Sequence, residues 1–205
     1  MKLQIIGFDR SNFVRTVRMV AHEKDVEYEL VPQTPHSLAV KAINPFGLIP
    51  VMRHGDLQIG ESQAIARYLD RIGSGAALIP AAPVFAARVD AWVATIATNI
   101  DKVLLRQYVV PYIFHKDDDG NVIRTDIDKA IKRFPRVFGT LNDAVSGGYV
   151  VGDTFSMADC FIMPMLAVAQ MFPEGKAAMA EHAALKEYFE RVGARESFVA
   201  TAPSA

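Results

Sequence analysis

The residues best suited to chemistry lie in three short stretches near the start of the chain. Ser11 directly precedes a helical pattern, Glu61-Ser62 precede another, and Asn44–Met52 is a turn-rich stretch that contains two prolines. A hydroxyl at a helix start can donate a charge-assisted hydrogen bond to an anion, and the positive end of the helix dipole stabilises the same charge. The first two stretches therefore indicate binding sites for anionic groups.

The local pattern leaves the roles of both serines open. A serine before a helix is also a preferred N-cap, and for Ser11 the local pattern alone favours capping. Asn12 is an alternative donor without a hydroxyl. For Glu61-Ser62, a capping arrangement is again the alternative to ligand binding.

The stretch Asn44–Met52 combines a turn with a strand. Proline and glycine favour a turn over Asn44–Gly47, and Pro50 opens a run of β-forming residues. Ile49, before this proline, should be extended with its own N–H and C=O exposed, as an edge for docking another backbone. Proline also accepts a cis peptide bond at low cost. An ordinary loop that enters a strand is the alternative interpretation.

The elements around these stretches predict a small mixed sheet with helices packed against it. A strand, a helix that ends near Glu23 and a second strand form a βαβ unit, whose strands should be parallel. A hairpin turn at His54–Asp56 then joins two antiparallel strands. The other expected elements are strands at 3–8, 27–31 and 57–59, a weak helix at 34–43 and a helix that ends near Ile72.

The rest of the chain is helical. Residues 73–83 are rich in Gly, Ala and Pro without periodicity, which marks a domain boundary. The predicted domains are 1–73, a linker at 74–83, and an all-helical domain at 84–205. Pro111 and Pro135 should bend or end helices locally. The expected helices are 84–114, 126–145, 156–171 and 183–192.

Composition excludes several classes of function. The 205 residues are 51% hydrophobic and 22% charged, with a formal net charge of -1, so no basic footprint for nucleic acid or an anionic membrane is present. No export signal is visible, and no apolar run approaches the about 20 residues of a membrane span. A single cysteine, Cys160, excludes a disulfide framework within the chain. We expect a cytoplasmic protein without nucleic-acid or membrane partners.

Three other motifs are interpreted as structural. The acidic run Asp117–Gly120 suggests a calcium loop, but that register places His115 at the first ligand position, so the ligand set fails and no metal is expected. Ser156–Asp159 fits a capping box. Cys160 follows in an apolar helix and is interpreted as a core thiol.

Four motifs, in this order, resemble the cytosolic glutathione transferase family over nearly the whole chain. The resemblance implies a thioredoxin-like N-terminal domain followed by an all-helical C-terminal domain, glutathione as co-substrate, and a homodimer. The motifs are Ser11-Asn-Phe-Val-Arg-Thr-Val-Arg18, Asn44-Pro-Phe-Gly-Leu-Ile-Pro50, Glu61-Ser62 and Gly152-Asp-Thr-Phe-Ser156-Met-Ala-Asp159.

The resemblance also implies roles for site residues. A free thiol with a pKa near ~8.5 is only a few per cent ionised at neutral pH, so the family stabilises the thiolate of glutathione. Ser11 would do so here. A tyrosine has this role in other classes of the family, but the first tyrosine of this chain is Tyr28, in a strand. A cysteine at position 11 would suggest disulfide exchange, and its absence favours conjugation or isomerisation. The implied site residues are Ser11 as the catalytic residue and Phe13, Ile49, Pro50, Glu61 and Ser62 as glutathione-binding residues. His36 and Lys41 are left out because their segment aligns poorly with the family.

The implied function is the conjugation of glutathione to an electrophilic, largely apolar small molecule, in detoxification. A glutathione-dependent isomerase, dehalogenase or ether-cleaving enzyme of the same fold is an alternative, and so is a non-catalytic binding or regulatory protein. Asp101 or Asn99 of a partner subunit is a candidate for completing the γ-glutamyl site. The candidates for the electrophile site are Trp92, Asn99, Arg106, Tyr108, Tyr112 and Phe114.

Overall fold

The computed structural model describes residues 2–204, which form two compact units. The first unit extends to Ala82 and includes the chain from Gly193 onward, and the second is Pro83–Val192. The predicted helical domain, 84–205, differs from this division at its end. Arg195 forms an ion pair with Glu23 of the first unit, with Nη2 and Oε2 2.7 Å apart, and this contact helps to hold the last segment there.

The predicted linker, 74–83, belongs to the first unit up to Ala82. Lys24 is 2% exposed, and its ammonium donates to the main-chain carbonyls of Gly75 and Ala76. The same ammonium lies 3.3 Å from the carboxylate of Asp70. Because a buried cation needs such partners, Lys24 anchors the start of the linker.

A four-stranded mixed sheet forms the centre of the first unit, as predicted, with the strand order β2-β1-β3-β4. The β1–β2 pair is parallel, while β3 is antiparallel to both β1 and β4. The strands are β1 (Leu3–Ile6), β2 (Tyr28–Val31), β3 (Val51–His54) and β4 (Leu57–Ile59).

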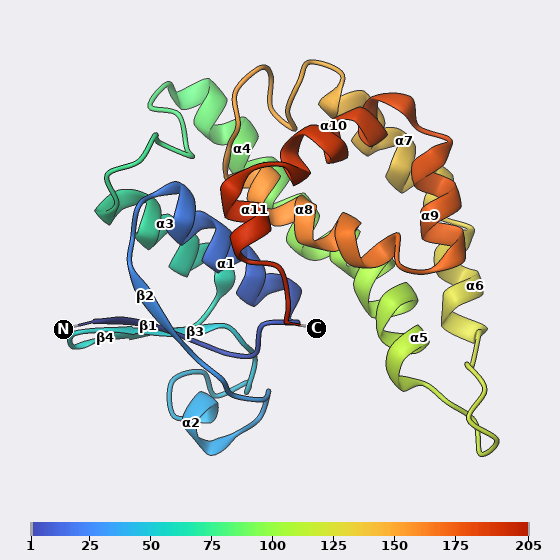
Figure 1. Ribbon diagram of the computed structural model, residues 1–205, viewed down its shortest axis with the longest axis horizontal. Helices are drawn as coiled ribbons and strands as arrows, with labels where there is room; N and C mark the ends of the chain where they lie inside the picture. The colour runs from blue at the N-terminus through green and yellow to red at the C-terminus, as the bar shows by residue number, and fades with distance from the viewer. Residues whose placement is uncertain (1, 205) are drawn as a thin grey trace. The chain divides into compact units, whose positions relative to one another are not determined.

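Helices cover both faces of this sheet. Figure 1 shows α1 (Asn12–Glu23) and α3 (Ser62–Ile72) on one face and α2 (Leu38–Lys41) on the other. The predicted apolar stripe of α1 is fully buried at Val14, Val17 and Val20. The predicted weak helix at 34–43 is reduced to the single turn of α2. A short helix, α11 (Glu196–Ala200), contacts α1 and was not predicted.

The second unit is all-helical, as predicted. Residues 83–114 form one helical stretch, whose middle part has the wider hydrogen-bond spacing of a π-helix. The predicted helix at 126–145 is two helices that separate before Pro135, which cannot continue the hydrogen-bond ladder. The helix α9 was not predicted, because its start, Pro173-Glu-Gly175, has the composition of a turn. The elements are α4 (Pro83–Thr95), η1 (Ile96–Ile100), η2 (Lys102–Val109), α5 (Val110–Phe114), α6 (Thr125–Ile131), α7 (Phe134–Val145), α8 (Met157–Ala169), α9 (Pro173–Ala180) and α10 (Ala183–Gly193).

The motifs interpreted as structural have the expected surroundings. The capping box forms at the start of α8, where the Asp159 carboxylate accepts the main-chain N–H of Ser156 at 2.8 Å. Cys160 is buried. Asp117 closes an exposed turn by accepting the N–H groups of Asp119 and Asn121. Within residues 2–204, no group of His, Cys, Asp and Glu side chains has an arrangement that would hold a metal ion.

No helix in the described part of the chain combines the length and the apolar character needed to cross a bilayer.

Candidate functional site

Three segments reach the same edge of the sheet in the first unit. The antiparallel register pairs Ile6 with Val51, so the end of β1 lies beside the start of β3. Met52 pairs with Ile59, so the end of β4 reaches the same edge. The segments that follow β1, precede β3 and follow β4 therefore meet there. They are 7–13, 44–50 and 60–62, which contain all six residues that the sequence predicted for the site.

Gly7 allows the first turn of α1 to approach the loop before β3. Its φ is +153°, and a Cβ at this position would lie 2.5 Å from Val14 Cγ2 and 3.3 Å from Ile49 Cβ. A residue with a side chain would push these two groups apart. The backbone that leads to Ser11 therefore lies directly against Ile49.

Ser11 is the N-cap residue of α1 by its backbone conformation. Its φ and ψ are -74° and 125°, and its carbonyl accepts the first helical hydrogen bond, from Arg15 N–H at 2.9 Å. The side chain is half-buried, and none of the described residues donates a capping hydrogen bond to its hydroxyl. The Ser11 hydroxyl therefore does not cap the helix, although the local pattern favoured that role.

The start of α3 has an unusual backbone at Glu61. Its φ is +67°, in a region that residues with a side chain seldom occupy. The Glu61 carbonyl accepts Ile65 N–H at 3.0 Å, while its exposed side chain makes no capping hydrogen bond with any residue in the described range. Ser62 follows as the first helical residue and is half-buried. Backbone outliers of this kind are concentrated at functional sites.

The Ile49-Pro50 peptide bond is cis, the isomer that the sequence suggested. Ile49 is partly buried against a small core cluster of Ile6, Val40 and Val51, and Pro50 is buried. Phe13, the second residue of α1, is half-buried at the same edge.

Asn44 joins two of the three segments, although the sequence assigned it no role in the site. Its Nδ2 donates to Leu48 O at 3.3 Å, and its Oδ1 accepts Phe46 N–H at 3.1 Å. A Cβ at Gly60 would lie 3.1 Å from Asn44 Nδ2, so the side chain also contacts the turn before α3. The available signal was the Asn-Pro dipeptide, because asparagine side chains commonly close turns of this type.

His36 also lies against the loop before β3, although it was left out of the predicted site. Its N–H donates to Gly47 O at 2.8 Å, and the ring fills the space that a side chain at position 47 would need. Both residues have positive φ, +64° at His36 and +70° at Gly47. No sequence pattern indicates this conformation at a histidine. Lys41, at the end of α2, is exposed.

The starts of α1 and α3 make this edge favourable for anions. Neither helix has an acidic residue in its first turn that would neutralise the positive end of the dipole, and the acidic residues that precede the two starts are Asp9 and the N-cap residue Glu61. Both helices begin at the same edge because α1 follows β1 and α3 follows β4. An extended ligand with two anionic groups would be stabilised at both starts.

Three of the six candidates for an electrophile site, the two tyrosines and Arg106, have structural partners in the second unit. Tyr108 is fully buried, and its hydroxyl donates to Glu174 and accepts Gly175 N–H at 2.7 Å. Burial is the largest cause that raises the Tyr108 pKa. Tyr112 donates to the same carboxylate at 2.6 Å. Tyr108 is therefore a core residue, and its hydroxyl is not available to a ligand.

Arg106 and Asp101 form an ion pair with each other, with Nε and Oδ2 3.0 Å apart. Asp101 is 7% exposed, and burial raises the pKa of its carboxyl although Arg106 acts in the opposite direction. The Arg106 guanidinium, a candidate for the electrophile site, thus already has a partner. Of the remaining candidates, Trp92 is half-buried, and Asn99 and Phe114 are exposed.

Comparisons with known proteins match both halves of the chain to one family. The model described as "Glutathione S-transferase, N-terminal domain" matches residues 5–76, and "Glutathione S-transferase, C-terminal domain" matches residues 122–191. The first match includes all three segments of the site.

Individual relatives agree with this result over nearly the full length. Glutathione S-transferase 3 of Zea mays is 28% identical and aligns over 97% of this chain and 92% of its own. A probable maleylacetoacetate isomerase of Vibrio cholerae is 27% identical over 99% and 96% of the two chains. The crystal structure of glutathione transferase F7 from Populus trichocarpa superposes with a TM-score of 0.87 at 25% identity, covering 97% of each chain. With both domains matched, the chain belongs to the glutathione S-transferase family.

Proposed function

We propose that the protein is a glutathione transferase of the serine type, in which Ser11 stabilises the thiolate of glutathione. The observation that carries the proposal is the Ser11 hydroxyl, which lies at a helix start without serving as a cap. The edge that holds Ser11 also holds Ile49 and the Glu61-Ser62 pair. Glutathione is an extended tripeptide with a thiol between two carboxylate ends, which suits an edge with two helix starts.

Each site residue has a distinct task in this proposal. Ser62 and the first amides of α3 hold the γ-glutamyl carboxylate, and Glu61 receives the ammonium. Ile49 pairs its N–H and C=O with the cysteinyl backbone, as in the addition of a β-strand residue. Pro50 fixes the end of this loop, and Phe13 lines the pocket. The thiol is thereby held beside the Ser11 hydroxyl.

The chemical step needs only the thiolate and a positioned electrophile. The thiol proton passes to solvent, and the Ser11 hydroxyl donates a hydrogen bond to the sulfur, which favours the ionised form. The sulfur then attacks an electrophilic carbon, a carbon–sulfur bond forms, and the displaced group takes its electron pair or a double bond takes up a proton. Positioning and electrostatic stabilisation supply the rate enhancement.

Calorimetric titration with reduced glutathione tests this proposal. The native chain should bind in the micromolar to millimolar range. Ser62→Ala should weaken binding by about 1–3 kcal/mol, because it removes a hydrogen-bond partner of a bound carboxylate. Ser11→Ala should bind nearly as tightly but raise the pKa of the bound thiol, followed by its ultraviolet absorbance. Ser146→Ala is the matched control, since this exposed serine lies in the second unit.

The outcomes separate the alternatives. No detectable binding by the native chain would contradict the transferase proposal and favour a partner-binding protein of the same fold. If glutathione binds but Ser11→Ala does not change the thiol pKa, only the serine mechanism is excluded, and the glutathione site stands. If the expected pattern appears, product analysis with a panel of electrophiles distinguishes conjugation from isomerisation, dehalogenation or ether cleavage, which would use the same thiolate.

Three other expectations stay predictions, two of them from the family resemblance and one, the location, from the sequence composition. They are assembly into a homodimer, a cytoplasmic location and a role in the detoxification of electrophiles. Light scattering of the purified protein tests the first of them.

A further inference from the structure

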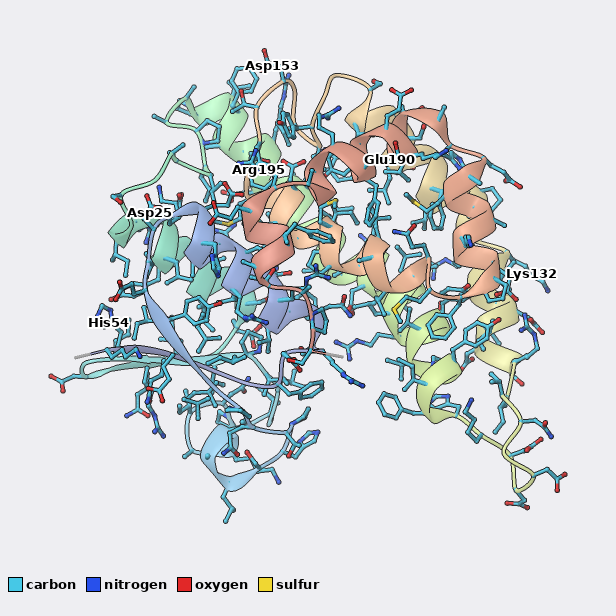
Figure 2. All side chains as sticks on the ribbon, viewed as in Figure 1. Asp25, His54, Lys132, Asp153, Glu190 and Arg195 are labelled. Carbon is cyan, nitrogen blue, oxygen red and sulfur yellow. The ribbon has the colours of Figure 1, made fainter. Side chains whose placement is uncertain are left out.

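The segment Gly193–Ser204, which begins at the last residue of α10, returns along the whole length of α1, and we name it the return segment. It begins at the C-terminal end of α1, where Arg195 binds Glu23 through two hydrogen bonds of 2.9 and 2.7 Å. Ser197 Oγ donates to the same carboxylate at 2.5 Å. Figure 2 labels Arg195 at the start of α11. This end of the segment is firmly anchored.

The middle of the return segment binds two arginines of α1. Arg15 Nη2 donates to Phe198 O at 2.9 Å, and its guanidinium lies 3.9 Å from the centroid of the Phe198 ring. Arg18 Nη1 donates to Thr201 O at 3.3 Å. Arg15 is 7% exposed and Thr201 is fully buried, so the segment is part of the packed first unit up to this residue.

The last described residue of the segment, Ser204, reaches the turn that precedes Ser11. Its N–H donates to Asp9 Oδ2 at 2.8 Å, and its carbonyl accepts from Arg10 Nη2 at 3.4 Å. This hydrogen bond from Ser204 is the main cause that lowers the pKa of the Asp9 carboxyl. Figure 1 shows the chain running from α11 to this end of α1. The segment therefore contacts the two residues that come directly before Ser11.

The turn itself is weakly held without these contacts. One main-chain hydrogen bond closes it, from Ser11 N–H to Phe8 O at 3.1 Å. Asp9 is only partly buried and Arg10 is exposed, so little apolar burial fixes their backbone. Ala202, Pro203 and Ser204 are exposed as well, and their contribution to global stability is correspondingly small.

We infer that the return segment positions the catalytic hydroxyl, with Ser204 and Asp9 acting as positioning residues for Ser11. This inference rests on the proposed role of Ser11. The hydrogen bond between Ser204 and Asp9 limits the motion of the turn, and the turn sets the direction of the hydroxyl at the start of α1. A hydroxyl that is misdirected stabilises the thiolate less, while the separate contacts to the two ends of glutathione persist.

Two pairs of full-length variants isolate this hydrogen bond. Ser204→Pro removes the main-chain donor, whereas Ser204→Ala keeps it. Asp9→Ala removes the acceptor, and Asp9→Asn keeps an acceptor at the same net charge as Asp9→Ala. Comparison within the second pair therefore excludes a direct effect of the aspartate charge on the thiolate.

The readouts are the thiolate absorbance of bound glutathione across pH, its dissociation constant, and hydrogen exchange of the Ser11 amide. Ser204→Pro should lower the thiolate fraction at neutral pH by about threefold relative to Ser204→Ala, with the dissociation constant changed less than about twofold. Asp9→Ala should differ from Asp9→Asn in the same direction. The Ser11 amide should exchange faster in Ser204→Pro and in Asp9→Ala, because local opening of the turn becomes easier.

Failure of this inference and failure of the proposed function give different results. If Ser11→Ala lowers the thiolate fraction but Ser204→Pro and Asp9→Ala do not, the return segment has no positioning role. Unchanged exchange of the Ser11 amide in both variants overturns the inference whether or not glutathione binds. If the native chain binds no glutathione, the proposed function fails and this inference fails with it.

Discussion

The starts of α1 and α8 place the same residue type in the same helical position but use it differently. Ser11 and Ser156 are both N-cap residues with extended backbones. Ser156 is 3% exposed, and its hydroxyl donates to the Asp159 carboxylate at 2.9 Å. Ser11 is half-buried, and its hydroxyl has no capping hydrogen bond with any described residue. Ser156 serves folding, whereas the Ser11 hydroxyl makes no such capping contact, and we propose that it binds a ligand.

The carboxylate of Asp159 explains why the start of α8 is structural. Its Oδ1 accepts Val150 N–H at 3.0 Å and Tyr188 Oη–H at 2.8 Å. Its Oδ2 accepts both the N–H and the hydroxyl of Ser156. Asp159 is fully buried, so four donors depend on one side chain that water does not reach.

Asp159→Ala should cause the largest loss of stability among these changes. It leaves four buried donors without an acceptor, and we expect the free energy of unfolding to fall by about 3–5 kcal/mol. The folded fraction should still bind glutathione, because the change lies in the second unit. Urea unfolding followed by circular dichroism measures the effect.

Asp153→Ala is the matched control for this prediction. Figure 2 labels Asp153 in the loop before α8, where the residue is exposed, and we expect a change of about 0.5 kcal/mol or less. Equal stability of the two variants would show that the capping box is dispensable, and the contrast between the two helix starts would then disappear.

Ser11→Ala and Ser156→Ala should give opposite results. Ser11→Ala should lower kcat/KM by about 10²-fold, the loss typical for one donor to a developing or stabilised anion, without a change in the unfolding midpoint. Ser156→Ala should keep kcat/KM and lose about 1 kcal/mol of stability, since the main-chain donor to Asp159 remains. Steady-state kinetics and urea unfolding on both variants make the comparison. A destabilised Ser11→Ala with full activity would assign Ser11 to capping.

Local signals in the sequence were sufficient for the fold and for the segments of the candidate site. Proline and glycine mark the turn before Pro50, and alternation marks the strands, so the mixed sheet and the helical second domain were predicted correctly. The capping box at Ser156 was visible because its two members are three residues apart. The functions of Ser11 and Ser62 stay predictions, because only a ligand reveals them.

Long-range contacts explain what the sequence did not predict. The return segment was assigned to the helical domain, but Arg195 and Glu23 are 172 positions apart, and no periodicity links them. Tyr108 has helical spacing that suits either a pocket or a core, and only its hydrogen bonds to the start of α9 identify it as core. Asn44 has the signature of a turn residue, whereas its contact with Gly60 requires the folded sheet.

Helix α1 is anchored at the end opposite Ser11, where the Glu23 carboxylate accepts hydrogen bonds from Arg195 and Ser197. Burial raises the pKa of this carboxyl, but the hydrogen bonds from Arg195 and Ser197 outweigh burial, so the pKa lies below its ordinary value. Glu23→Gln should therefore cost about 1 kcal/mol of stability at neutral pH, about as much as Ser156→Ala. Exposed Glu190, labelled in Figure 2, provides the control Glu190→Gln, which should have no measurable effect.

The stability that Glu23 contributes should depend on pH, and its lowered pKa sets the direction of this dependence. Between the lowered pKa in the folded chain and the ordinary pKa of glutamate, the unfolded chain binds more protons than the folded chain does at Glu23. The stabilisation by Glu23 is therefore complete above the ordinary pKa and is lost as the pH falls through the lower value. Urea midpoints of the native chain and of Glu23→Gln should differ at neutral pH and converge in acid. A difference that stays constant over this range would mean that Glu23 holds α1 by packing. A charged contact that anchors α1 would then have to lie elsewhere.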